Sequence, residues 1–382
     1  MLNRRSLIAS SALLTGALFA PKVAFAALPT DRRLVFVIQR GAADGLATLA
    51  PAGDPAYAAL RGELAEFGDG AIKLDGLFTL HPSLARIGDR YKAGEALFVH
   101  ATASPYRDRS HFDGQNVLET GGAQPYDRED GWMNRLVGLI PGGPARALAI
   151  SPAIPTALRG PATVSSYAPS NLPDASPEFL NRVGMLYAGD PQLHGLWSEA
   201  LQTRAMAGDL ASDGGRGAAA AGTLVSSLMS GPEGARLVMV ETTGWDTHAG
   251  QRGRLSNQLT GLDALLDALR TGLGPAWGDT LVVVATEFGR TAAINGTGGT
   301  DHGTGGLAML LGGTVKGGRI VADWPGLGQA ALHESRDLKP TTPLDAVLAG
   351  AIAGHFGLDP ALAARVLFPG GSGRPLTGLI RG

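Results

Sequence analysis

The sequence predicts an α/β fold in which a mostly parallel central sheet lies between two layers of helices. Short segments rich in Val, Leu and Ile are apolar throughout, as strands covered on both faces are. These predicted strands span residues 33–39, 96–101, 146–150, 236–242, 280–286 and 306–313. Segments with helical spacing of Leu, Ala and Val lie between or after them, at 176–189, 191–208, 257–274 and 343–357. Such alternation predicts helices on both faces of one sheet.

The bulk composition narrows the class of protein. The chain has 382 residues, of which 44% are hydrophobic and 17% charged, as in ordinary globular proteins. Its net charge of −2 and its lack of basic runs argue against nucleic acid as a partner, because phosphate-backbone binding needs a concentrated basic surface. Cysteine is absent, which excludes disulfides, thiolate metal ligands and cysteine nucleophiles.

The N-terminus has the pattern of an export signal. The pair Arg4-Arg5 precedes an apolar stretch, and Ala24-Phe25-Ala26 places small residues where a signal peptidase needs them. We therefore expect a twin-arginine signal peptide over residues 1–26, cleaved near Ala26 after use of the twin-arginine export machinery. Residues 27–382 would form a single mature domain in the periplasm or outside the cell. The apolar stretch is shorter than the roughly 20 residues of a membrane span, so we do not expect an integral membrane protein.

Polar side chains collect directly after several predicted strands. Because ligands bind beyond the carboxyl ends of the strands in open α/β sheets, we expect these side chains to meet there. The candidates are Asp44, Ser110, His111, Asp246, His248, Glu287, Arg290, Asp301 and His302.

The acidic and histidine candidates suggest a metal site. Carboxylate oxygens and imidazole nitrogens together favour Zn²⁺ or Mn²⁺, with Mg²⁺ and Ca²⁺ as alternatives. Such an ion polarises a phosphoryl or sulfuryl oxygen and lowers the pKa of a bound hydroxyl group. The predicted metal ligands are Asp44, Asp246, His248, Glu287, Asp301 and His302.

Several candidates also have a structural explanation. Asp44 is equally suited to cap a helix, and Asp246 or Thr247 could cap the helix that follows them. Glu287 could form an ion pair with Arg290. His302 is harder to explain in this way, because a histidine gains little from exposure in a glycine-rich loop.

Ser110 is a candidate nucleophile. It opens a segment with helical spacing, and the start of a helix offers unpaired N–H groups and a positive dipole that favour an alkoxide and an incoming anion. The alternative is an ordinary helix cap, since serine is among the commonest residues at that position.

Long motifs spread over nearly the whole mature chain point to a known family. They include RGAADGL, LHPSL, YKAGEALFVHATASPYRDRSHFDGQNVLETG, GWDTHAGQ, DTLVVVATEFGRT, GTDHGTGG and VKGGRI. Together they resemble the exported domain-of-unknown-function 1501 (DUF1501) family, which is grouped with the alkaline phosphatase-like superfamily. That superfamily includes phosphatases, sulfatases, phosphodiesterases and cofactor-independent phosphoglycerate mutases. The resemblance implies a three-layer α/β/α sandwich of the alkaline phosphatase-like type.

The resemblance also implies roles for individual residues. It makes Asp44 the metal-binding aspartate at the end of the first strand, although a few residues late. It makes Ser110 the nucleophile, with His111 as an alternative alignment. Asp246 and His248 correspond to a later metal-binding pair, which the superfamily usually spaces more widely.

One position departs from the superfamily's pattern. In "TEFG", Glu287 matches a metal-binding aspartate, but Phe288 stands where a histidine ligand is usual, and His302 matches the final histidine. A phenyl ring cannot bind a metal, so one of two expected ions loses a ligand. The site would then hold a single ion, recruit His111 or Asp301 as a replacement ligand, or be a relic.

These observations lead to an expected function and its alternatives. The first is an exported metal-dependent hydrolase of a phosphate or sulfate ester, with one or two ions and with Arg107, Arg109 and Arg290 holding the anionic substrate. The second is a catalytically degenerate relative that binds an anionic ligand, a glycan or a partner in the same cleft. The third is a purely structural envelope protein, which leaves "TDHG" and "WDTH" unexplained.

Overall fold

The computed structural model describes residues 31–140, 146–168, 177–207, 217–371 and 373–381. The predicted signal peptide and its cleavage site lie outside these residues. Within the described ranges, no helix combines the length and the apolarity that a bilayer crossing requires.

A nine-stranded central sheet forms the middle layer of the fold. Its order is β11 (Arg319–Val321), β5 (Ala96–Ala103), β10 (Gly306–Leu311), β9 (Thr280–Ala285), β1 (Arg33–Gln39), β8 (Leu237–Thr242), β6 (Ala147–Ile150) and β7 (Ser165–Tyr167), with β12 (Thr342–Pro343) also paired to β5. Within it β10 is antiparallel to β5 and β9, and the other strand pairs of the described residues are parallel. The predicted mostly parallel sheet is therefore confirmed.

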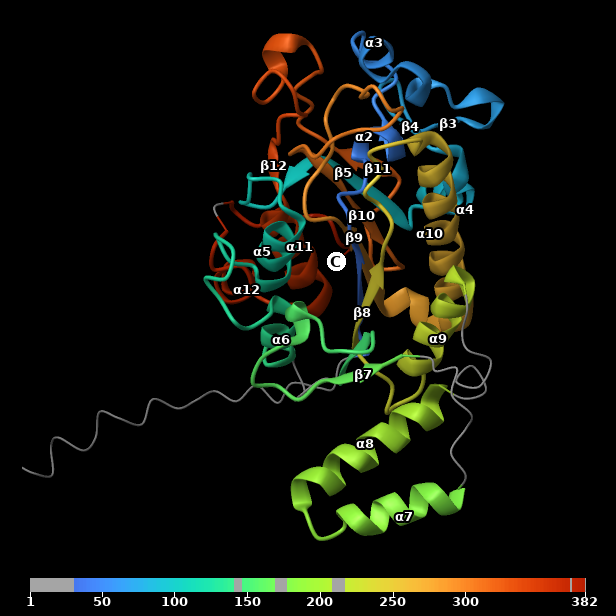
Figure 1. Ribbon diagram of the computed structural model, residues 1–382, viewed down its shortest axis with the longest axis vertical. Helices are drawn as coiled ribbons and strands as arrows, with labels where there is room; N and C mark the ends of the chain where they lie inside the picture. Colours follow the sequence, from blue (N-terminus) through green and yellow to red (C-terminus); the bar gives the residue numbers. More distant parts are fainter. Residues whose placement is uncertain (1–30, 141–145, 169–176, 208–216, 372, 382) are drawn as a thin grey trace, which may run out of the picture.

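Alternate residues of β1 enter two separate hydrophobic cores. Leu34, Phe36 and Ile38 face one core, and Val35 and Val37 face the other. The first core lies under α5 (His111–Thr120), α6 (Trp132–Val137), α11 (Leu344–Phe356) and α12 (Pro360–Leu367), and the second under α4 (Ala85–Lys92), α9 (Ala218–Met229) and α10 (Gln251–Leu273). Figure 1 shows these two helical layers on opposite sides of the sheet. The strands are apolar on both faces because both faces are covered.

Smaller elements complete the chain. Helices α7 (Pro177–Tyr187) and α8 (Pro191–Ala207) pack on each other and extend from the main body (Figure 1). A second sheet has the order β2 (Leu49–Ala50), β4 (Thr79–Leu80) and β3 (Ile72–Lys73), near the short helices α2 (Gly45–Thr48) and α3 (Tyr57–Arg61). Short 3₁₀ helices occur at Gly62–Ala65, Gly68–Gly70, Pro82–Leu84, Thr156–Leu158, Gly274–Asp279 and Gln329–Ala331.

The direction of β10 is set by the loop before it. Residues 286–305 leave the carboxyl end of β9 and return to the same edge of the sheet without a crossover helix. A chain that returns in this way enters the next strand antiparallel. The loop therefore lies across the edge at which β9, β1 and β8 end, and this edge is where the polar candidates gather.

Asp44 and Arg61 form a buried ion pair just beyond β1. Asp44 accepts a hydrogen bond from the Ala47 N–H at the start of α2, and Arg61 also donates to the Thr291 carbonyl at 3.1 Å. Both side chains are almost fully buried. Burial raises the pKa of the Asp44 carboxyl, but the Arg61 charge and the hydrogen bonds from Arg61, Gln251 and Ala47 outweigh it, so this pKa lies below its usual value.

These contacts give Asp44 the helix-capping role that the sequence left open. Its carboxylate faces Arg61, Ala47 and Gln251, and it does not belong to the group of possible metal ligands described below. We expected Asp44 to bind the metal ion, but its contacts do not support this role. The Arg61 guanidinium occupies the position beside the carboxylate that a metal cation would take.

The Asp44–Arg61 pair yields a stability prediction. Asp44→Asn leaves the Arg61 charge buried without its carboxylate, so the free energy of unfolding should fall by about 3–5 kcal/mol at pH 7 in urea denaturation. The folded pKa of Asp44 is depressed, so its contribution is present above the unfolded value of about 3.9 and is lost as pH falls through the folded pKa. The difference between the two proteins should therefore shrink in acid.

The matched control is Asp359→Asn. Asp359 also caps a helix, at the start of α12, but no buried arginine of the described chain pairs with it. Asparagine is an equally good cap, so this variant should differ from the native protein by under about 1 kcal/mol. Equal effects of the two substitutions would contradict the assignment of the Asp44 effect to Arg61.

Candidate metal centre

The candidate ligands come from three segments that reach the same sheet edge. His111 is the first residue of α5, and Asp246 and His248 lie in the loop between β8 and α10. Glu287 follows β9 directly, and His302 lies in the loop that leads to β10. The topology explains this meeting, because β9, β1 and β8 are neighbours and end at one edge.

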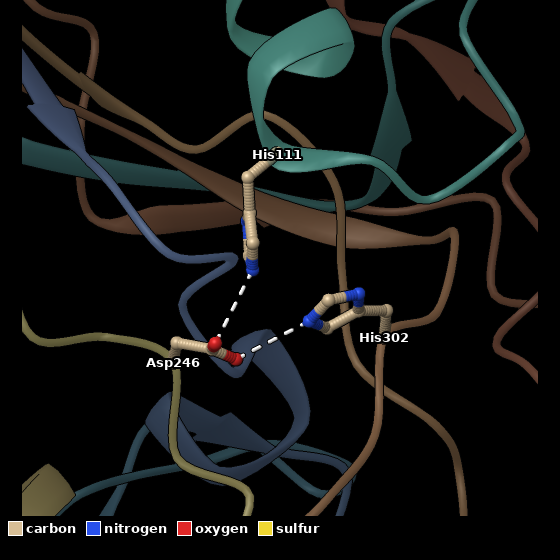
Figure 2. Close-up of side chains that lie close together, drawn as sticks. All are labelled: His111, Asp246 and His302. Atoms are coloured by element: carbon tan, nitrogen blue, oxygen red, sulfur yellow. Dashed lines mark hydrogen bonds and ion pairs between the residues drawn. The ribbon is translucent and has the colours of Figure 1, made fainter.

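His111, Asp246 and His302 form a group that could hold a metal ion. One ligand atom from each lies within 4.8 Å of the others. The His111 Nε2 atom is 3.4 Å from Asp246 Oδ2, and the His302 Nε2 atom is 3.3 Å from Asp246 Oδ1 (Figure 2). The carboxylate thus lies between two imidazole rings that point their Nε2 atoms toward it.

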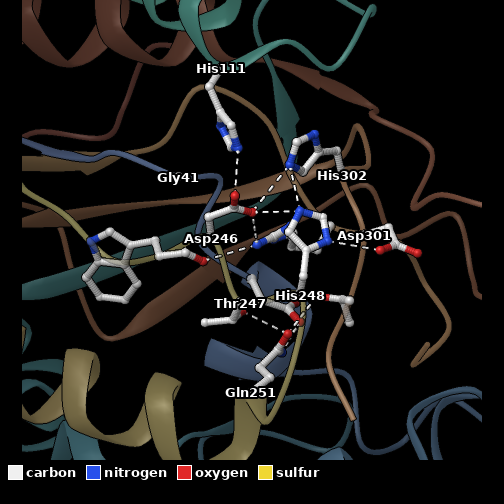
Figure 3. Close-up of polar contacts among 12 residues, drawn as sticks. Gly41, His111, Asp246, Thr247, His248, Gln251, Asp301 and His302 are labelled. Carbon is white, nitrogen blue, oxygen red and sulfur yellow. Dashed lines mark hydrogen bonds and ion pairs between the residues drawn. The ribbon is translucent and has the colours of Figure 1, made fainter. Parts of the chain in front are cut away.

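His248 approaches the same carboxylate. Its Nε2 atom is 3.0 Å from Asp246 Oδ1 and 3.0 Å from His302 Nε2 (Figure 3). Its side chain is 44% exposed, against 26% for His302 and 23% for His111, so His248 lies on the solvent side of the group.

Each of these three imidazoles has an acceptor on its other ring nitrogen. The Nδ1 contacts are His111 with Glu287 Oε1 at 2.8 Å, His248 with Asp301 Oδ1 at 3.0 Å, and His302 with the Arg109 carbonyl oxygen at 2.9 Å. An acceptor at Nδ1 favours the tautomer that carries its proton there and leaves the lone pair on Nε2. In the neutral state, three Nε2 lone pairs therefore point at one carboxylate.

This arrangement fits a divalent cation. Lone pairs that face carboxylate oxygens repel them unless a proton or a cation lies between. The His111 Nε2 atom is buried and makes no hydrogen bond with any residue that the structure describes, and its 3.4 Å approach to Asp246 is an ion-pair distance only. Two imidazoles with one carboxylate form a donor set that suits Zn²⁺ or Mn²⁺ better than Mg²⁺ or Ca²⁺.

The surroundings shift the pKa values of two of the histidines in opposite directions. The hydrogen bond to Glu287 raises the pKa of His111 against the opposing effect of burial, and the charges of Glu287 and Asp246 add to it. Burial lowers the pKa of His302, and the charges of His111 and Arg290 lower it further. In the metal-free chain His111 therefore binds a proton more readily than a free histidine does, and His302 binds one less readily.

Arg290 pairs with Asp246. Its Nη2 atom donates to Asp246 Oδ1 at 2.6 Å, and its side chain is fully buried. Burial raises the pKa of Asp246, but the charges of Arg290, His248 and His111 outweigh this effect and hold it below its usual value. The Arg290 Nε and Nη1 atoms are buried and have no hydrogen-bond partner within the described ranges. The predicted alternative, a Glu287–Arg290 ion pair, is not what the structure shows.

Glu287 is held behind His111. Its Oε1 atom accepts from the Gly41 N–H at 2.8 Å and from Gln115 Nε2 at 3.0 Å, besides the contact with His111. Burial raises its pKa, but the hydrogen bonds from His111, Gln115 and Gly41 outweigh this effect and leave it lowered. Glu287 was expected to bind the metal itself, yet its contacts make it the group that orients His111.

Phe288 supports the centre through packing. Its ring is 4% exposed and stacks on His111, with ring centroids 5.1 Å apart. Of the two replacements that the sequence offered for the missing histidine, His111 joins the group, whereas Asp301 contacts His248. Asp301 is held below its usual pKa, first by the hydrogen bond from His248.

The structure places Ser110 at the N-cap position of α5, directly before His111. Its side chain makes no capping hydrogen bond, and its backbone N–H donates to the Tyr106 hydroxyl at 3.0 Å. The two other arginines expected to hold an anion are engaged elsewhere. Arg109 pairs with Glu334 and Asp337, and Arg107 donates to backbone carbonyls.

The fold and the site together define an α/β protein with a candidate metal centre at the carboxyl edge of a mostly parallel sheet. A family model described as "Protein of unknown function (DUF1501)" matches residues 97–367, and the chain belongs to this family. Among curated protein sequences, none matches the chain.

Some solved structures are similar to the chain at low identity. Ps i-CgsB, in complex with k-i-k-neocarrahexaose, is 12% identical over 88% of this chain and 74% of that chain, with a TM-score of 0.43. The C-terminal periplasmic domain of EcEptC from Escherichia coli, in complex with Zn, is 9% identical over 74% and 73%, with a TM-score of 0.36. A phosphonate monoester hydrolase of Agrobacterium radiobacter is 13% identical over 76% and 70%, with a TM-score of 0.27. Similarity at this level assigns no activity to this chain.

The contact between His111 and Glu287 yields a prediction for the metal-free protein. Glu287→Gln removes the negative charge at Nδ1, so the pKa of His111 should fall in an NMR titration of the ring protons. A raised folded pKa stabilises the native state fully below the unfolded value of about 6.5, and this contribution is lost as pH rises through the folded pKa. As pH rises from about 6.5 through the folded pKa of His111, Glu287→Gln should therefore lose less stability than the native protein does.

Asp301→Asn is the matched control, because it alters the carboxylate behind His248 instead. It should leave the His111 titration in place. An unchanged His111 pKa in Glu287→Gln would show that Glu287 does not set the protonation of this ring.

Proposed function

We propose that the chain is an exported, metal-dependent hydrolase of a phosphate or sulfate ester. The observation that carries this proposal is the convergence of imidazole Nε2 atoms on the Asp246 carboxylate, each ring being oriented by an acceptor at Nδ1. His111, Asp246 and His302 would be the ligands of one ion. A set of three protein ligands is typical of catalytic centres, since it leaves a coordination position open.

The charge of the site supports binding of a divalent cation. The carboxylates of the group and its supports belong to Asp246, Glu287 and Asp301, and the guanidinium of Arg290 pairs with Asp246. With neutral imidazoles this leaves an excess of negative charge that a divalent ion compensates. When bound there, such an ion supplies a Lewis acid that polarises a phosphoryl or sulfuryl oxygen.

The chain's own residues supply the remaining chemistry. His248, with Asp301 at its Nδ1, is a half-exposed pair that can accept or donate a proton beside the group. Ser110 is the candidate nucleophile, since it precedes the ligand His111 and its hydroxyl is not used to cap α5. The assignment to phosphate or sulfate esters rests on the resemblance of the sequence motifs to the alkaline phosphatase-like superfamily, and the location outside the cytoplasm rests on the predicted signal peptide.

A second candidate function is binding without turnover of an anionic ligand, a glycan or a partner. Phe288 favours it, because its ring occupies the position of an expected ligand and packs under His111. Arg290 also favours it, because its guanidinium already neutralises Asp246.

Metal content is the first prediction from this proposal. Protein purified after native export without a histidine tag should carry about one equivalent of Zn or Mn by elemental mass spectrometry, as a single three-ligand centre requires. His302→Ala and His111→Ala should each lose it, because each removes one of three ligands. His194→Ala, an exposed histidine on α8, is the control and should retain the metal. Equal metal in all four proteins would exclude this centre.

Turnover is the second prediction. On an aryl phosphate or sulfate ester that the native protein cleaves, His248→Ala should lower kcat by about 10²-fold or more while metal is retained, because it removes the proton carrier and not a ligand. Asp246→Asn should lower activity and metal content together. If the native protein cleaves no ester in a broad panel but has a higher Tm in the presence of an anionic ligand, the function as a binding protein is favoured instead.

A further inference from the structure

Two of the three ligands of the proposed centre, Asp246 and His302, lie on loops that are far apart in the sequence. Asp246 directly precedes Thr247, and His302 lies two residues after Thr300. The distance between Asp246 and His302 therefore depends on how these two loops are held together.

Gln251 joins the two loops through its side-chain oxygen. It is the first residue of α10 and is fully buried. Its Oε1 atom accepts from the Thr247 hydroxyl at 2.9 Å and from the Thr300 hydroxyl at 2.6 Å. Figure 3 shows this amide directly beneath the histidine cluster, with Thr247 beside it. One side chain thus contacts a neighbour of each group of ligands.

The orientation of this amide is set by Asp44. The Gln251 Nε2 atom donates to Asp44 Oδ2 at 2.6 Å. Arg61 keeps the Asp44 carboxylate ionised, so it can only accept hydrogen bonds. Reversal of the amide would set its oxygen against this carboxylate and leave its nitrogen facing two hydroxyls. The ion pair therefore fixes which end of Gln251 faces the loops.

Backbone contacts show that the two loops are closely apposed at this point. The Thr300 N–H donates to the Thr247 carbonyl at 3.2 Å, and the Gln251 N–H donates to the Gly298 carbonyl at 2.8 Å. A Cβ atom at Gly299 would lie 2.3 Å from the His248 carbonyl carbon, so only glycine fits there. The start of α10 is thus capped by the loop that carries His302.

We propose that Gln251 is a positioning residue that sets the affinity of the centre for its metal. It holds Thr247 and Thr300, and with them Asp246 and His302, at the spacing that coordination requires. This inference rests on the proposed metal-dependent function. It also gives Asp44 a role in the site, two hydrogen bonds away from the ligands.

The test is the affinity of the metal-free protein for Zn²⁺, measured by competition with a chelating dye. Gln251→Met keeps the length of the side chain but removes both hydrogen-bonding ends, and it should raise Kd about 10–100-fold, the usual effect of removing a group that orients ligands. Thr247→Val and Thr300→Val each remove one donor and should each weaken binding by a smaller factor. If Gln251→Met does not fold, the two threonine variants still test the inference.

The control for general destabilisation is Leu255→Ala. Leu255 is a buried residue one turn further along α10, and its removal leaves a cavity in the second core. It should lower Tm without changing the Kd for Zn²⁺. An equal rise in Kd for Leu255→Ala and Gln251→Met would overturn the inference, since the effect would then follow stability alone.

The remaining outcomes separate this inference from the proposed function. If the native protein binds Zn²⁺ no better than His302→Ala, the metal centre itself is wrong. If the native protein binds Zn²⁺ and the Gln251 and threonine variants bind it equally well, the centre stands and the positioning role of Gln251 is wrong. A selective rise in Kd for those variants supports both.

Discussion

The carboxylate of Asp246 is the point at which the polar side chains of this protein meet. His111, His248 and His302 all turn their Nε2 atoms toward it, and the buried guanidinium of Arg290 donates to it. Lone pairs that converge on a carboxylate in this way are repelled by it unless a proton or a cation lies between them. The acceptors at the Nδ1 atoms of the three rings, and Phe288 stacked on His111, hold the rings in this orientation.

The sheet determines why these residues come together. Strands β9, β1 and β8 are adjacent and parallel, so their following loops share one edge, and the returning loop before β10 adds His302 to it. Buried apolar strands supply a rigid base, while the loops supply the chemistry. The site depends on both faces of the sheet, because helix α10, which carries Gln251, packs on the second core.

Much of this could be predicted from sequence, because it depends on local patterns. The continuous apolar strands predicted the parallel sheet, and polar residues at their ends predicted the site. The pattern could not show that Asp44 pairs with Arg61, since that partner lies on a separate short helix. It also could not show that Glu287 orients His111. Glutamate and histidine are both ordinary metal ligands, and only the three-dimensional contacts show that Glu287 faces His111 and that His111 faces Asp246. Gln251 carried no signal in the sequence, because the predicted helix began only at residue 257.

Anomalous diffraction from crystals grown with Zn²⁺ or Mn²⁺ would show whether this cluster holds a metal ion. We expect one strong peak within about 2.0–2.2 Å of a nitrogen of His111, a nitrogen of His302 and an oxygen of Asp246, the distances typical of such ligands. The nitrogen in each ring should be Nε2, with Nδ1 still facing its acceptor. A peak elsewhere, or no peak while these rings keep their positions, would contradict the claim that this cluster exists to hold a metal ion.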